Sequence, residues 1–144
     1  FHEKDFEEES EFFKKEDNID WKYFIYYFKN KPIAFTEIKV FQSNHVLTGQ
    51  FGWDYENPKL GLGTYATLHE IDWSIKNKCK KYYLSFGYEN TSLYKSRFDG
   101  FEFWNGRGWI SNKSLYKKLC EHDTEINTLE ELNIYQRKYF KLNG

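Results

Sequence analysis

The first half of the chain alternates short apolar runs with turn-forming residues, a pattern that predicts strands joined by tight turns. Residues 21–28 are aromatic at almost every position and predict a strand. Residues 29–32 (KNKP) predict a turn, and 33–41 predict the second strand of a hairpin. A third strand is predicted over 46–53, where two glycines indicate a bulge or a close approach of backbone.

A turn rich in glycine and proline then leads into a segment with helical periodicity. Apolar residues fall at intervals of three and four, so we expect one apolar stripe of this helix to be buried. A short buried strand is predicted over 82–86, which completes a strand–turn–helix–strand unit behind the hairpin. The predicted fold class is therefore α/β (α+β). The stripe consists of Leu68, Ile71, Ile75 and Cys79.

The remainder of the chain predicts smaller elements. Residues 91–97 predict a short helix, and 101–104 with 109–111 predict a hairpin around Asn105–Gly108. From Ser114 the pattern predicts one or two surface helices.

The formal net charge of −1 is a cancellation between unlike segments. Residues 1–20 form an acidic lead-in of net charge −6, residues 21–119 carry +7, and the helical segment 120–144 carries −2. The total excludes a uniformly basic nucleic-acid binder, but the basic central segment is compatible with a phosphate-rich partner. We interpret 21–119 as the main domain, with 120–144 packed on or beside it.

The amino-acid composition further narrows the classes of protein to which the chain can belong. The chain has 14 Phe, 12 Tyr and 5 Trp, so its core must be built from rings. This richness is typical either of base stacking or an aromatic ligand slot, or of a biased composition without functional meaning. Two cysteines without metal-ligand spacing predict neither a zinc site nor a disulfide framework, and no apolar run has the length of a membrane helix. We expect a cytoplasmic protein without a membrane partner, and the absence of Met indicates a piece of a longer chain.

The glycine-rich turn at Leu60–Thr64 is the first candidate for chemistry. The N-terminus of a helix presents unpaired N–H groups and a partial positive charge, and glycine allows a phosphate to approach the backbone closely. The sequence has neither the lysine of a P-loop nor the third glycine of a Rossmann fingerprint. The turn is therefore either an anion site or a purely structural connection.

The order of these elements, together with three local motifs, resembles the GNAT acyltransferase superfamily. The details are most similar to the catalytic domain of arginyl- and leucyl-tRNA–protein transferases, over roughly residues 21–110. The motifs that carry the resemblance are Trp53-Asp54-Tyr55-Glu56, Leu62-Gly63-Thr64-Tyr65 with Leu68-His69-Glu70-Ile71, and Tyr94-Lys95-Ser96-Arg97-Phe98.

The resemblance implies a twisted, mainly antiparallel sheet in which the strand before the GxG-led helix is splayed from the next one. It implies transfer of an aminoacyl group from aminoacyl-tRNA to an amine of a protein or small molecule, with no tightly bound cofactor. It also implies that Tyr94 protonates the leaving group and that Gly61 and Gly63 hold the phosphates of the donor.

Several neighbouring residues have side chains that suit a role in acyl transfer. For each of them a simpler structural explanation is also possible. Asp54 and Glu56 are candidates to bind the acceptor amine or accept its proton, or they are solvated carboxylates at a strand end. Tyr94 is otherwise a core or surface tyrosine. Further candidates to bind the phosphates of the acyl donor are Leu62, Thr64, Lys59, Lys95 and Arg97, and the alternative for the charged ones is a solvated face. The candidates to line the acyl slot are Gly52, Trp53 and Phe86, and the alternative for this strand is a packing irregularity.

Two other hypotheses stay open. An acetyl-CoA-dependent N-acetyltransferase of the same fold is one, although Pro58 occupies the position where CoA-using members usually have Arg or Gln. A non-catalytic interaction domain that retains the fold is the other. No Ser-His-Asp, Cys-His or metal-ligand grouping is seen, so we expect direct transfer without a covalent enzyme intermediate. His69 is interpreted as an exposed helix residue, and Glu70 either as a helix-surface charge or as a residue that faces the site.

Overall fold

The structure is a computed structural model that describes residues 19–42, 44–56, 60–85 and 88–139. The chain divides into two compact units, Phe1–Ser85 and Phe86–Gly144, and each is considered by itself. The boundary differs from the divisions at 20/21 and 119/120 that charge indicated. The changes in charge composition at residues 20 and 120 do not coincide with the division between Ser85 and Phe86.

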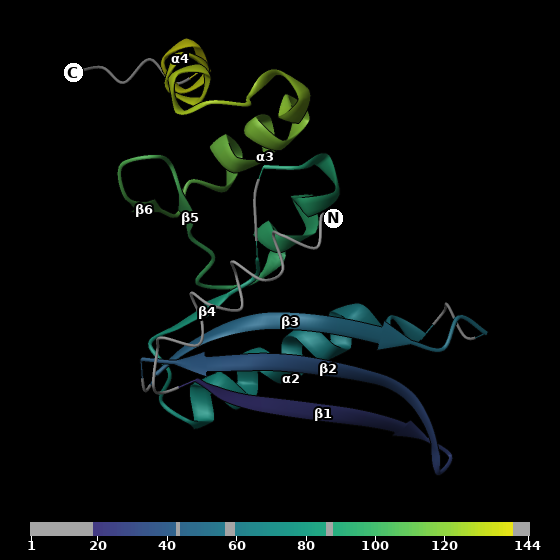
Figure 1. Ribbon diagram of the computed structural model, residues 1–144. Coiled ribbons are helices and arrows are strands. Elements are labelled where there is room, and N and C mark those ends of the chain that lie inside the picture. Colours follow the sequence, from purple (N-terminus) through teal and green to yellow (C-terminus); the bar gives the residue numbers. More distant parts are fainter. Residues whose placement is uncertain (1–18, 43, 57–59, 86–87, 140–144) are drawn as a thin grey trace, which may run out of the picture. The chain divides into compact units, whose positions relative to one another are not determined.

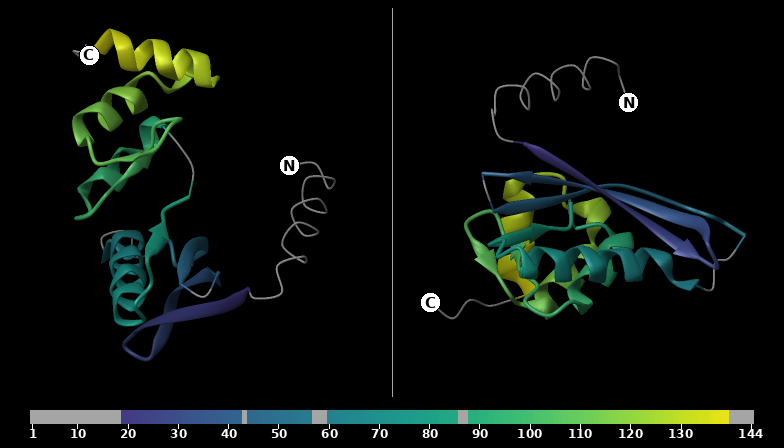
Figure 2. Two further views of the ribbon diagram at one scale, coloured as in Figure 1. Left: turned by 90° about the vertical axis from the view of Figure 1, so that its left-hand side faces the viewer. Right: turned by 90° about the horizontal axis from the view of Figure 1, so that it is seen from below.

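The first unit contains a four-stranded sheet of order β1-β2-β3-β4 (Figure 1). The three antiparallel strands are β1 (Asp20–Phe28), β2 (Lys31–Phe41) and β3 (His45–Trp53), and β4 (Lys81–Tyr83) pairs parallel to β3. Helix α2 (Leu62–Lys76) connects β3 to β4 and runs along one face of the sheet, as Figure 2 shows. The predicted mixed α/β (α+β) class is confirmed, with the predicted mainly antiparallel pairing.

The hairpin of β1 and β2 follows from its two-residue turn. Lys29 and Asn30 both have positive φ, 47° and 63°, as a type I′ turn requires. The turn is thus shorter than the predicted KNKP, and Pro32 already belongs to β2. The register shifts between Tyr26 and Tyr27, next to the Tyr27–Pro32 pair, which fits the restriction of proline to edges and irregular positions of sheets.

The core of the first unit lies between the sheet and α2. Its least exposed apolar side chains, Ile38 and Val46, come from the sheet, and Ala66 comes from the helix. The buried positions of α2 are Leu62, Ala66, Glu70 and Ser74, each four residues after the last. The predicted apolar stripe is therefore wrong, because Leu68 and Ile75 lie on the outer face, 51% and 69% exposed.

The second unit combines short helices with a two-stranded sheet. A 3₁₀ segment, η2 (Asn90–Arg97), precedes the antiparallel strands β5 (Phe103–Trp104) and β6 (Trp109–Ile110). Helix α3 (Lys113–Glu121), the short η3 (Asp123–Glu125) and α4 (Leu129–Tyr139) follow. The helix and hairpin predicted for this region are confirmed. Its core includes Phe101, Phe103, Leu115, Tyr116, Leu119, Cys120 and Leu132.

A capping box fixes the start of α4. The Thr128 hydroxyl accepts a hydrogen bond from the backbone N–H of Glu131 (3.2 Å), and the Glu131 carboxylate accepts bonds from the N–H groups of Thr128 (3.0 Å) and Asn127 (2.8 Å). Hydrogen bonding, above all from Asn127, holds the pKa of the Glu131 carboxyl below its usual value. The charged carboxylate is therefore the form that supports the helix end.

We predict that Thr128→Ala lowers the free energy of unfolding of this region by about 1 kcal/mol, because the side-chain acceptor for the Glu131 N–H is lost. Since the pKa of Glu131 is lowered on folding, its contribution is present above the unfolded pKa of about 4.3 and is lost as pH falls through the folded value. Circular dichroism against pH and urea measures both effects. Thr124→Ala is the matched control, and an equal loss there would contradict the capping role.

Candidate functional site

The parallel pairing of β3 and β4 is short. It joins His45 to Lys81, Val46 to Tyr82 and Leu47 to Tyr83. Strand β3 continues to Trp53, and in the described part of the chain no strand pairs with it on this side beyond Leu47. The second half of β3 and the end of β4 thus form an incomplete parallel pair, the arrangement that a splayed strand pair requires.

Gly52 lies in this second half of β3 because a side chain from β2 fills the space beside it. Gly52 is opposite Phe35 in the register, and a Cβ at Gly52 would collide with the Phe35 ring. The pairing of β2 with β3 also shifts register between Thr36 and Ile38. Glycine in this strand therefore permits a close approach next to an irregularity, as the sequence indicated.

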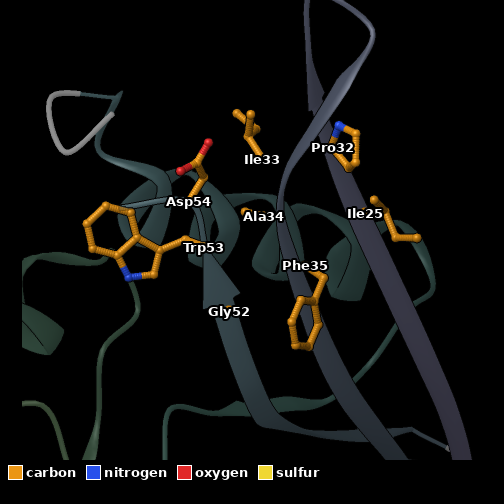
Figure 3. A pocket seen from close by; sticks show the side chains of 8 residues that line it. All are labelled: Ile25, Pro32, Ile33, Ala34, Phe35, Gly52, Trp53 and Asp54. Atoms are coloured by element: carbon orange, nitrogen blue, oxygen red, sulfur yellow. The ribbon is translucent and has the colours of Figure 1, made fainter. Parts of the chain in front are cut away.

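A pocket of about 450 Å³ opens at the end of β3 (Figure 3). Asp54 is one of its lining residues, and apolar residues of β1 and β2 supply most of the remainder. Two of the three predicted acyl-slot residues, Gly52 and Trp53, meet Asp54 here, while Phe86 lies outside the described residues. The lining residues are Ile25, Pro32, Ile33, Ala34, Phe35, Gly52, Trp53 and Asp54.

Asp54 organises the turn that follows β3. Its backbone N–H donates to the carbonyl of Ile33 (2.8 Å), and its carboxylate accepts from the N–H of Glu56 (3.0 Å). Lys31 Nζ lies 3.5 Å from Asp54 Oδ2 and 3.9 Å from Glu56 Oε2. The Asp54 side chain is 20% exposed and that of Glu56 81% exposed, so Asp54 is the carboxylate that is held in place.

Helix α2 begins after a glycine in an unusual backbone conformation. Gly61 is the N-cap, with φ 59° and ψ 34° in the left-handed region that glycine tolerates best. No side chain caps this end, and the first turn carries no acidic residue. Gly63 and Thr64 are exposed at the first turn, whereas Leu62 is buried against Ile33 and Ala34. Lys59 lies outside the described residues.

The remaining candidates belong to the second unit. Tyr94, Lys95 and Arg97 all lie in η2. Tyr94 is half-exposed, and partial burial raises the pKa of its hydroxyl above the ordinary value. Lys95 is 7% exposed and burial lowers the pKa of its ammonium, which does not suit the predicted contact with a phosphate from solution; Arg97 is exposed. The predicted site residues thus divide between two units.

Sequence reasoning missed a buried polar cluster under α2. Glu70 is 2% exposed, and its carboxylate accepts hydrogen bonds from the hydroxyls of Thr36 and Tyr82. His69 Nδ1 lies 3.0 Å from the hydroxyl of Tyr26, whose pKa is raised by burial and then by the charge of Glu70. The interpretation of His69 as exposed and that of Glu70 as a helix-surface charge are wrong, because His69 is half-buried and Glu70 is buried. The spacing of Ala66, Glu70 and Ser74 was the available signal.

Among the described residues, no three His, Cys, Asp or Glu side chains are grouped as metal ligands would be. In the same part of the chain, no helix combines the length and apolar character needed to cross a membrane. Comparison of the chain with models of protein families, with curated proteins and with solved structures gives no match, so its function has to be argued from its own residues.

Proposed function

We propose that the chain is a GNAT-like acyltransferase that moves an aminoacyl group from aminoacyl-tRNA to an amine. One observation carries the proposal: β3 pairs with β4 over three residues and then continues, past a pocket, toward a glycine-capped helix end without a side-chain cap. A carbonyl group needs a site where backbone donors are not used by a neighbouring strand, and an anionic donor needs free N–H groups. The half of β3 beyond its pairing with β4 and the uncapped start of α2 follow one another along the chain, and they support these two roles.

The proposed reaction is a direct transfer. The acceptor nitrogen attacks the carbonyl carbon, a C–N bond forms, and the ester C–O bond to the ribose breaks. The proton that the amine loses goes to a carboxylate, for which Asp54 is the better-held candidate. The resemblance assigns the proton for the departing oxygen to Tyr94, which belongs to the second unit. Solvent then restores both groups. Because such a reaction uses no covalent enzyme intermediate, the described residues need not supply a nucleophile.

A second donor, acetyl-CoA, fits the same helix end. The uncapped first turn of α2 suits a diphosphate as well as the terminal phosphates of an RNA. We prefer aminoacyl-tRNA as the donor because Pro58 occupies the position at which CoA-using members of the superfamily usually have a residue that binds the diphosphate. A non-catalytic domain of the same fold is the remaining alternative. The reaction is proposed for the reducing cytoplasm, in keeping with two cysteines that are both free.

We predict that Gly63→Glu weakens donor binding about tenfold or more, because it places a carboxylate where the donor phosphates would lie. The same acid favours the helix dipole, so the helix itself is not weakened. Gly63→Ala is the matched control, since a Cβ there meets Phe51 at an ordinary 3.8 Å. Binding of labelled aminoacyl-tRNA and of acetyl-CoA is measured in parallel at several salt concentrations.

The companion experiment is a transfer assay with both donors and a mixture of amine acceptors. Incorporation from aminoacyl-tRNA, reduced by Gly63→Glu and unchanged by Gly63→Ala, is the expected result. Incorporation from acetyl-CoA alone would replace the proposed donor by the second one. If neither donor binds and neither group is transferred, the enzyme proposal is overturned and the non-catalytic alternative stands.

A further inference from the structure

Strand β1 has a free edge with few of the features that usually protect one. It is the outermost strand of the first unit, and no strand of the described chain pairs with its outer side. Edge strands are commonly protected by proline, by charges or by being short. The nine residues of β1 (DWKYFIYYF) contain no proline or glycine, and no charge occurs between Tyr23 and Phe28.

The face of β1 that points away from α2 is also apolar. Trp21, Tyr23, Ile25 and Tyr27 alternate along it and are 41% to 64% exposed. Phe35 extends the patch onto β2, opposite Ile25 in the register, and is 45% exposed. The alternate residues Phe24 and Tyr26 instead contact α2 through Trp73, His69 and Tyr65. The edge is thus continuous with an aromatic surface that, among the described residues, is covered only at Trp21, where Lys39 Nζ lies 4.5 Å from the ring centroid.

We infer that a second copy of this chain covers the edge, with the two β1 strands antiparallel about a two-fold axis at Phe24. Phe24 is the central residue of the strand. Pairing about it sets Trp21 against Tyr27 of the second copy and Tyr23 against Ile25 of the second copy. Every cross-strand pair on the open face is then apolar, and such pairs are the units that stabilise a sheet.

The charges of the strand favour the same arrangement. Asp20 is at one end of β1, where its carboxylate lies 2.6 Å from Lys22 Nζ, and Lys29 comes directly after the other end. Antiparallel pairing brings the Asp20 end of each copy to the Lys29 end of the other, so opposite charges meet twice. A parallel arrangement would place like charges together at each end. Antiparallel pairing therefore suits the end charges of β1 better than parallel pairing does.

The first test is the mass of the full chain in solution across a wide range of concentration, by light scattering. A dimer is expected, and Ile25→Lys should weaken it about tenfold or more, because the charge enters the centre of the new sheet. Ile75→Lys is the matched control, since Ile75 is 69% exposed on the outer face of α2. Thermal melts of both variants establish that the fold is retained.

Cysteine cross-linking tests the register. The double variant Tyr23→Cys/Ile25→Cys should form a covalent dimer under mild oxidation, whereas Tyr23→Cys alone should not, because residue 23 faces residue 25 of the second copy. The unmodified chain, with Cys79 and Cys120, is the background control. A chain that is monomeric at every concentration overturns the inference, as does a dimer unaffected by Ile25→Lys. A dimer without the double-variant cross-link overturns the pairing.

Discussion

Replacement of Glu70 with alanine is expected to lower the free energy of unfolding of the first unit by about 3 to 5 kcal/mol. The carboxylate accepts hydrogen bonds from the hydroxyls of Thr36 and Tyr82, and Glu70 and Thr36 are almost fully buried. Its removal leaves hydroxyls without their acceptor and a cavity between α2 and the sheet. A urea titration followed by tryptophan fluorescence measures the loss, since Trp73 lies in the same helix.

Three further variants separate the hydrogen bonds from the cavity. Glu70→Gln keeps the shape and one acceptor oxygen, so we expect a smaller loss. Glu70→Leu combined with Thr36→Val and Tyr82→Phe removes donors and acceptor together and should recover much of the stability, because no hydroxyl is left unsatisfied. Asp72→Ala, which breaks an exposed pair with Lys76 at 2.6 Å, is the surface control and should cost little. A loss at Glu70→Ala no larger than at Asp72→Ala would contradict the buried role.

The same cluster explains why the sequence predicted helix α2 but not its buried face. Periodicity of apolar residues located the helix, and the glycines located its start at Leu62. The predicted orientation of the helix was wrong because its buried face is decided by hydrogen bonds among three side chains, one each from α2, β2 and β4. These three residues are far apart in the sequence. Small residues at 66 and 74 then let the helix approach the sheet. A count of apolar residues alone predicts that Leu68 and Ile75 are buried, whereas both side chains are exposed on the outer face of the helix.

Local turn chemistry was more informative than composition. The β1–β2 hairpin and the glycine-capped helix depend on neighbouring residues, so both could be predicted within a few positions. The division at Ser85 depends on which segments pack together over long separations, and a charge profile carries no information about that. For the candidate site, adjacency along the chain predicted the grouping of Gly52, Trp53 and Asp54, whereas the burial of Lys95 arises from packing within the second unit.

Tyr94→Phe is expected to slow the proposed transfer by a factor of about a hundred or more, because the departing ribose oxygen then has no proton donor. The ring and its edge contact with Phe98, 6.5 Å between centroids, are retained, so the change is confined to the hydroxyl. Partial burial raises the pKa of Tyr94 above its ordinary value of about 10, so the protonated, donating form persists through neutral and mildly alkaline pH. The rate of the unmodified chain should therefore not fall through loss of this proton as pH rises from neutrality.

The leaving group decides what Tyr94→Phe means. A thiol departs readily as a thiolate, whereas a ribose hydroxyl is far less acidic and needs a proton. The variant should therefore slow transfer from aminoacyl-tRNA much more than transfer from a thioester, and single-turnover rates with both donors measure that difference. Tyr23→Phe is the control, since Tyr23 is 64% exposed on β1 and lies outside the proposed site. Equal rates for Tyr94→Phe and Tyr23→Phe would remove Tyr94 from the mechanism, while equal slowing with both donors would assign it to positioning and not to proton transfer.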